Sequence, residues 1–137
     1  MLQTNDSNNE TVVGGAQLLS TTAQTYTVAS LNGVFFFQYK LFTADATIPE
    51  TASIGLATFD GTGKCKITSK TVSDGKVTTK TQSCTYTVAS DGIGSISTGV
   101  VFALGGASSG QANGLQFIIS GAKDSGNYVF LGGANMQ

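Results

Sequence analysis

The chain contains neither histidine nor arginine, and these two absences exclude several classes of function. Without histidine, the Ser-His-Asp and Cys-His catalytic arrangements cannot form, and the usual zinc and iron ligand sets are missing. Without arginine, no side chain can clamp a phosphate or carboxylate through a bidentate fork. The sequence therefore favours a non-enzymatic protein that has no catalytic residues, no metal site and no cofactor.

Charge and long apolar runs are also scarce. Charged residues make up 11% of the chain and the formal net charge is −1, which offers no basic surface for nucleic acid. No apolar run approaches the roughly 18 residues of a membrane-spanning helix, so neither nucleic acid nor a membrane span is expected. Five of the seven lysines cluster, either solvating an exposed ribbon or forming a polyanion patch. They are Lys64, Lys66, Lys70, Lys76 and Lys80.

Turn residues and alternating apolar positions dominate what is present. The chain has 18 glycines among abundant Ser and Thr, with one proline, Pro49. Short alternating segments separated by Gly-containing turns are typical of β-strands, and no segment shows a helical period with caps. We predict an all-β protein: a single antiparallel up-and-down β-barrel of about eight strands with no substantial helix. Residues 23–137 would form the barrel, and residues 1–22 a flexible N-terminal leader.

The two cysteines lie on either side of a predicted hairpin turn at Asp74-Gly75. Counting outward from a two-residue turn places Cys65 opposite Cys84, within the Cα separation that a disulfide requires. Two buried free thiols are the alternative. Paired cysteines and low charge together favour an oxidising location, so the protein is expected to be secreted, extracellular or at the cell surface.

Two further strand assignments follow from the pattern. The hexamer TYTVAS occurs at Thr25–Ser30 and again at Thr85–Ser90, and its alternation is that of a half-buried strand in both places. A three-residue loop ending in a left-handed Gly92 would pair Tyr86 with Ile96 and open one strand from Ile93 to Leu104.

The strand Val34–Phe42 is the most apolar, and Gly55 is expected to mark a bend or bulge in the strand that follows it. Six aromatic side chains are predicted to point inward, where they either fill the core or line a cavity for one small apolar ligand. They are Phe35, Phe37, Tyr39, Tyr86, Phe102 and Phe117.

Four segments resemble an exported bacterial domain family of the Acidobacteria type. They are SLNGVFFF at Ser30–Phe37, ATFDGTGK at Ala57–Lys64, TYTVASDGIG at Thr85–Gly94, and Tyr128–Gly132. The resemblance covers about Ala29–Gly133 and consists of turn and strand motifs. It implies a small lipocalin-like or allene-oxide-cyclase-like barrel, mostly of unassigned function, and it carries over no catalytic residue.

Three functions are compatible with these features. The first is an exported β-barrel binding module for a small apolar ligand. The second is a structural subunit that self-associates through residues 12–19, which would add a strand to a neighbouring barrel in a fibre or surface layer. The third is a barrel isomerase or cyclase, in which Tyr39, Glu50 or Tyr86 gives acid-base help.

Overall fold

The computed structural model describes residues 2–5, 11–14, 24–42, 51–105, 110–123 and 126–136. Within these ranges the chain is built almost entirely of strands, with a single turn of 3-10 helix, η1. The all-β prediction is confirmed. The elements are β1 (Leu2–Asn5), β2 (Thr11–Gly14), η1 (Val28–Ser30), β3 (Asn32–Phe42), β4 (Thr51–Asp60), β5 (Lys64–Ser73), β6 (Lys76–Val88), β7 (Ile93–Ile96), β8 (Val100–Gly105), β9 (Gly114–Lys123) and β10 (Gly126–Met136).

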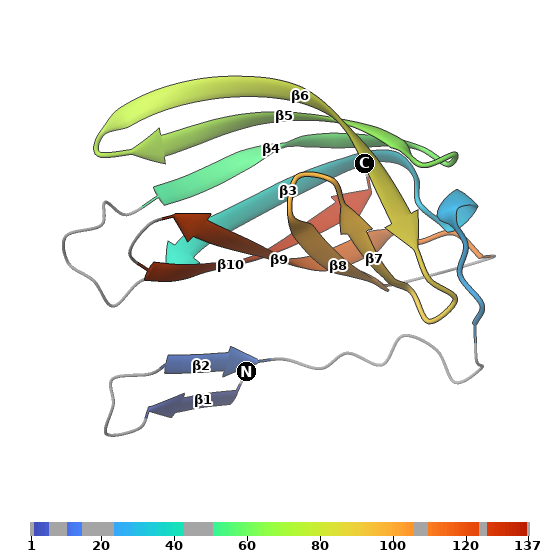
Figure 1. The fold of residues 1–137 in the computed structure, drawn as a ribbon, viewed down its shortest axis with the longest axis horizontal. Coiled ribbons are helices and arrows are strands. Elements are labelled where there is room, and N and C mark those ends of the chain that lie inside the picture. Colours follow the sequence, from blue (N-terminus) through green and yellow to red (C-terminus); the bar gives the residue numbers. More distant parts are fainter. Residues whose placement is uncertain are drawn as a thin grey trace.

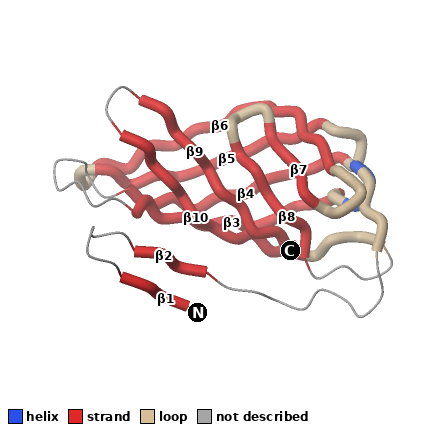
Figure 2. Tube along the Cα trace, turned by 60° about the horizontal axis from the view of Figure 1, so that its bottom comes forward, coloured by secondary structure: helices blue, strands red, loops and turns tan. Residues whose placement is uncertain are grey.

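Eight strands, β3 to β10, close into one antiparallel barrel (Figures 1 and 2). Each strand pairs with its neighbours in sequence, and β10 closes the ring by pairing with β3 from Val129↔Phe42 to Met136↔Phe35. This confirms the up-and-down barrel. β1 and β2 form a separate two-stranded sheet, with Leu2 opposite Gly14. In the part of the chain that the structure describes, no helix has the length and apolarity to cross a membrane.

Two of the predicted strands are wrong, although their errors cancel in the number of strands. The first TYTVAS copy is not a strand, because the Tyr26 N–H donates to the Ser90 carbonyl, 3.1 Å away, and the chain then turns into η1. The predicted strand Ile93–Leu104 is divided into β7 and β8. Its interruption is a turn in which the Gly99 N–H donates to the Ile96 carbonyl at 3.0 Å and Gly99 takes a φ of 89°. A left-handed residue of this kind favours glycine.

The cysteine hairpin folds as predicted. Asp74 and Gly75 both have positive φ, 50° and 69°, as a type I′ turn requires. Cys65 lies directly opposite Cys84, and the two form a disulfide with a Cα separation of 4.9 Å. The next loop also follows the prediction, because Tyr86 pairs with Ile96.

Gly55 makes room for an aromatic ring rather than for a bulge. The antiparallel registers of β4 with β3 and with β5 run through Gly55 without interruption, so the predicted bulge is wrong. Phe37 lies opposite Gly55, and a Cβ added at Gly55 would stand 2.6 Å from Cζ of the Phe37 ring. The missing side chain therefore lets the ring lie across the inner surface of β4.

One end of the barrel is filled by a packed core. Phe35 is fully buried, and its ring meets Phe59 edge-on with centroids 5.6 Å apart. Phe59 in turn meets Tyr86 edge-on at 5.1 Å. Leu31, which directly follows η1, is also fully buried, and the Ser30 carbonyl accepts a hydrogen bond from Ala112 at 2.9 Å. The segment around η1 is therefore part of the packed end (Figure 1).

Tyr86 links the barrel wall to η1. Its hydroxyl lies 2.7 Å from the Leu31 carbonyl and 3.1 Å from the Val28 carbonyl, and the hydroxyl proton is donated to this pair of acceptors. Burial raises the pKa of the Tyr86 hydroxyl above its usual value of 10.0. The side chain therefore remains a neutral hydrogen-bond donor at neutral pH.

Replacing Tyr86 with phenylalanine is expected to lower the free energy of unfolding by about 1–3 kcal/mol, because the buried Leu31 carbonyl loses its donor. The difference in the free energy of unfolding between the two proteins should shrink at high pH. Above the unfolded-state pKa, the unfolded wild-type chain loses the Tyr86 proton while the folded chain keeps it, so stability falls as pH rises. Urea unfolding of both proteins at about pH 8 and about pH 11 measures this. An equal difference at both values would contradict it.

Candidate functional site

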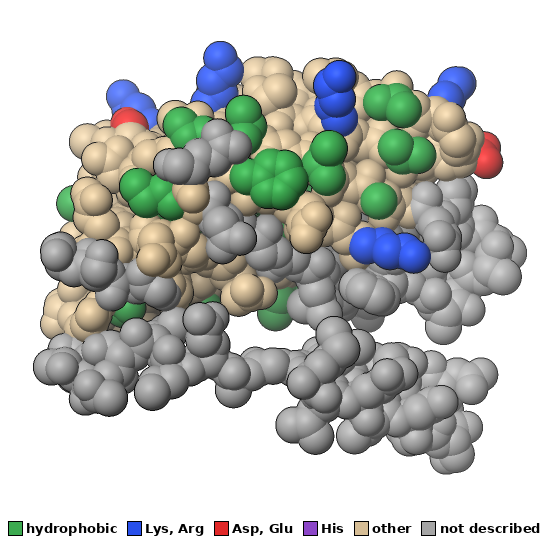
Figure 3. All heavy atoms as spheres, turned by 180° about the vertical axis from the view of Figure 1, so that it is seen from behind, with side chains coloured by type: hydrophobic (Ala, Val, Ile, Leu, Met, Phe, Trp, Pro, Cys, Tyr) green, Lys and Arg blue, Asp and Glu red, His purple; other side chains and the backbone are tan. Residues whose placement is uncertain are grey.

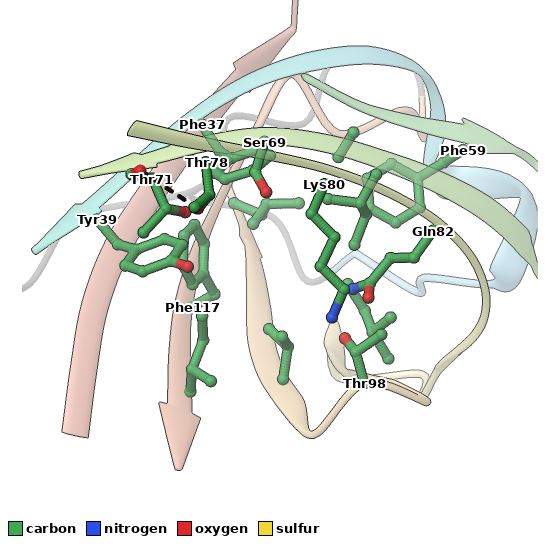
Figure 4. A pocket seen from close by; sticks show the side chains of 16 residues that line it. Phe37, Tyr39, Phe59, Ser69, Thr71, Thr78, Lys80, Gln82, Thr98 and Phe117 are labelled. Carbon is green, nitrogen blue, oxygen red and sulfur yellow. Dashed lines mark hydrogen bonds between the residues drawn. The ribbon is translucent and has the colours of Figure 1, made fainter. Parts of the chain in front are cut away.

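The other part of the barrel interior is hollow. A cavity of about 320 Å³ extends from the ring of Phe59 along the inner faces of the strands (Figure 4). The apolar side chains in its lining come from β3, β4, β5, β7, β8 and β9, whereas the polar ones come from β5, β6 and the β7–β8 turn. The apolar residues are Phe37, Tyr39, Ala57, Phe59, Ile67, Ile96, Val100, Leu115, Phe117 and Ile119; the polar residues are Ser69, Thr71, Thr78, Lys80, Gln82 and Thr98.

The six aromatic residues predicted to point inward divide between the packed end and the cavity. Phe35, Tyr86 and Phe102 are at most 3% exposed and belong to the packed core, and none of them lines the cavity. The lining instead contains the other three, which form an aromatic wall. These are Phe37, Tyr39 and Phe117.

The aromatic wall is held by ring contacts. Phe37 stacks on Tyr39 with centroids 6.2 Å apart, and both rings meet Phe117 edge-on, at 6.3 Å and 6.1 Å. Offset and edge-on pairs of this kind add stabilisation beyond the area that they bury. The wall therefore presents a fixed apolar surface to the cavity.

The barrel wall is incomplete beside the cavity, between β6 and β9. β6 pairs with β7 only from Tyr86 to Val88, and among the described residues its Lys76–Cys84 part has β5 as its one partner strand. β9 pairs with β8 only as far as Ile119. Figure 1 shows the β5–β6 hairpin reaching far beyond β7 and β8. Residues from both margins line the cavity, so we call this gap the side opening.

The inner face of the β5–β6 hairpin changes from apolar to polar along its length. Its cross-strand pairs run from the disulfide through Ile67 opposite Gln82 and Ser69 opposite Lys80 to Thr71 opposite Thr78. The hydroxyl of Thr71 also forms a hydrogen bond with the buried hydroxyl of Ser53 on β4. The cavity therefore has an aromatic side and a polar side, and the polar side borders the side opening.

Lys80 lines the cavity, whereas the sequence interpretation named it only as one of the five clustered lysines. All four of Lys64, Lys66, Lys70 and Lys80 are exposed, but the first three alternate with the inward residues of β5, whereas Lys80 shares the parity of Cys84 and lines the cavity. The signal was present in the sequence, because residues an even number of positions apart on a strand face the same side. The side chain of Lys80 was overlooked because lysines are usually assigned to the solvent.

The two described residues suggested for acid-base chemistry, Tyr39 and Tyr86, are not brought together as a site. Tyr39 lines the cavity, but the hydroxyl of Tyr86 is bound to backbone carbonyls in the packed end. Glu50 lies outside the described residues, as do residues 15–19 of the segment proposed for self-association, whereas residues 12–14 belong to β2.

The carboxylates of Asp60 and Asp91 accept hydrogen bonds from nearby residues of their own turns. The Asp60 carboxylate accepts a hydrogen bond from the hydroxyl of Thr62 at 2.7 Å and others from the backbone N–H groups of Thr62 and Lys64, at 2.7 and 3.0 Å, and these bonds lower its pKa. Asp91 accepts one from the N–H of Ile93 at 2.9 Å. Neither carboxylate reaches the cavity lining.

The outer surface of the barrel carries apolar side chains of its own. Hydrophobic side chains gather on one outer face, with lysines around them (Figure 3). On β3 and β4, Phe36 lies opposite Leu56, and these side chains are 39% and 41% exposed. They alternate with the inward residues of the same strands, so this surface and the cavity lie on opposite sides of the wall.

Comparisons with protein-family models, with curated proteins and with solved structures found no match for this chain. The resemblance to exported bacterial barrel domains therefore stays a prediction. The fold and the cavity define the class: an eight-stranded up-and-down β-barrel with a closed strand order and one disulfide within the chain. One end of the barrel is packed, and the cavity in its interior reaches the gap between β6 and β9.

Proposed function

We propose that this protein is a non-enzymatic binding module that holds one small, mainly apolar ligand inside the barrel. The cavity of about 320 Å³ carries this proposal. It lies at the lower end of the range of about 300–1,000 Å³ that is typical of small-molecule sites. An interior filled by its own side chains would leave no such volume, since protein cores pack as densely as organic crystals.

The chemistry of the lining supports an apolar ligand. Of the sixteen described residues in the lining, ten are apolar or aromatic, and the rings of Phe37, Tyr39 and Phe117 contact one another. A ligand that covers this wall gains the free energy of removing apolar surface from water, about 25 cal/mol per Å². The side opening supplies an entry route that leaves the packed end intact.

The disulfide supports an exported protein. Cys65–Cys84 would be kept reduced in most cytosolic compartments and persists in oxidising ones. We therefore place the binding module outside the cell or at its surface, as the resemblance to exported bacterial domains also implies.

Two measurements test the proposal. Native mass spectrometry of gently purified protein should show a fraction of the chain with one extra small-molecule mass. Nile red, a neutral dye whose fluorescence rises in apolar surroundings, should bind with one site per chain and be displaced by decanol. The binding function would be refuted by a protein that carries no extra mass and shows no binding of Nile red that decanol can displace.

A further inference from the structure

We propose that the ligand is an amphiphile with an apolar tail and a single carboxylate, and that Lys80 binds this carboxylate at the side opening. The inference rests on the proposed binding function and specifies its ligand. It follows from the one charged side chain among the described residues that line the cavity and from where that side chain lies.

Lys80 gives the cavity one positive charge that no described carboxylate neutralises. It lies opposite Ser69, a neutral residue, and is the single charged residue among the sixteen described residues that line the cavity. The described carboxylates are Asp60, at the end of β4, and Asp74 and Asp91, in turns, and none of them belongs to the lining. A ligand with one negative charge would complete this site by a charge-assisted hydrogen bond.

The neighbours of Lys80 are also hydrogen-bond donors. In Figure 4 the side chains of Lys80 and Gln82, both from β6, extend toward Thr98 in the β7–β8 turn. An ammonium group donates up to three hydrogen bonds, an amide nitrogen two and a hydroxyl one, whereas a carboxylate only accepts. The three side chains therefore match an anionic head group and disfavour a cationic one.

The position of this group explains why the ligand should be an amphiphile. Lys80 is exposed and lies on the part of β6 that borders the side opening, whereas Phe37 and Phe117 of the aromatic wall are buried. A carboxylate at Lys80 can keep part of its hydration while its tail covers Phe37 and Phe117. Neither end of the ligand then loses water without a partner.

Displacement of Nile red by three compounds with the same decyl tail tests the inference: decanoate, decanol and decyltrimethylammonium. The proteins are the full chain, its Lys80→Met variant, and a Lys70→Met control, which removes the same charge from the outward face of the same hairpin. Lys80→Met should weaken decanoate binding about tenfold, since the contact is charge-assisted but partly exposed. Lys80→Met should leave the affinity for decanol within about twofold of the wild-type value. Lys70→Met should change the affinity for neither decanoate nor decanol by more than about twofold.

Salt gives a second measurement that needs no variant. The wild-type chain should bind decanoate at least about tenfold more tightly than decyltrimethylammonium at low ionic strength, and this preference should shrink toward about 0.15 M salt. Equal affinities for these two compounds, or an equal loss of decanoate affinity in the Lys70→Met and Lys80→Met proteins, would overturn the inference. Binding of decanol alone would overturn it too, yet leave the binding function intact. Failure of every probe, Nile red included, would reject both.

Discussion

Replacing both Cys65 and Cys84 with serine is expected to lower the free energy of unfolding by about 3 kcal/mol. The disulfide closes a loop across a sequence separation of 19 residues, which restricts the unfolded chain. The native hairpin should survive, because its register is also fixed by the Asp74-Gly75 turn and by the inward alternation of β5 and β6. The measurement is denaturant unfolding followed by circular dichroism, with the midpoint and slope compared between the two proteins.

The wild-type chain treated with a thiol reductant is the matched control. Its unfolding midpoint should fall to that of the Cys65→Ser, Cys84→Ser protein, while the reductant should leave the serine variant unchanged. The untreated chain should also weigh less than the reduced chain by the mass of the hydrogens lost in the disulfide. Equal midpoints for the wild-type and the serine variant would show that the bridge does not stabilise the fold.

Replacing Ser69 with phenylalanine is expected to weaken Nile red and decanol binding about a hundredfold, or ~2.7 kcal/mol. Ser69 is half-buried on the inner face of β5, lines the cavity and lies opposite both Gly55 and Lys80. A phenylalanine ring at this position would fill space that the proposed ligand uses. Because the site is hollow, the added ring should not force the strained packing that overfilling a dense core produces.

Thr68→Phe is the control for this variant. Thr68 is the preceding residue of β5 and pairs with Thr81 on the outer side of the hairpin, where their hydroxyls are 3.1 Å apart. The same added ring then points away from the cavity, so the affinity for both probes should stay within about twofold of the wild-type value. A Ser69→Phe protein that folds and binds the probes as well as Thr68→Phe does would place the binding site elsewhere.

Local chemistry allowed the hairpins to be predicted from the sequence. The Asp74-Gly75 turn predicted the register of β5 and β6. The three-residue loop that pairs Tyr86 with Ile96 was predicted because it keeps the apolar residues on one face. Both inferences depend on residues close together in the chain. Turn geometry and side-chain parity decide such pairings without knowledge of the rest of the fold.

The TYTVAS hexamer shows where local pattern stops being informative. In the second copy, Thr85–Val88 belong to strand β6. In the first copy, the last three residues, Val28–Ser30, form the 3-10 turn η1. The difference comes from tertiary partners. Tyr26 packs against Gly92 and donates its N–H to Ser90, so the first copy lies against the end of the second copy's strand instead of extending one. Propensity alone cannot distinguish the two settings.

The residues that line the cavity were only partly predictable from the sequence, for a similar reason. Alternation identified Phe37, Tyr39 and Phe117 as inward-facing, but it also gave Phe35, Tyr86 and Phe102 the same status. Which rings line a cavity depends on the shortness of β7 and β8, which follows from the turn at Gly99. Had β7 and β8 formed one long strand, as expected, β6 would have been paired along its length and the side opening would be absent.

Isoleucine methyl groups offer the most direct test of the binding cavity. In a spectrum of the isoleucine-methyl-labelled chain titrated with decanol, the cavity account predicts saturable shifts of Ile67, Ile96 and Ile119, which line the cavity, with one decanol per chain. The signals of Ile54, Ile93 and Ile118, each about half exposed on the outside of the barrel, should stay in place. Shifts in the outer methyl groups with none in the cavity methyl groups would contradict the account.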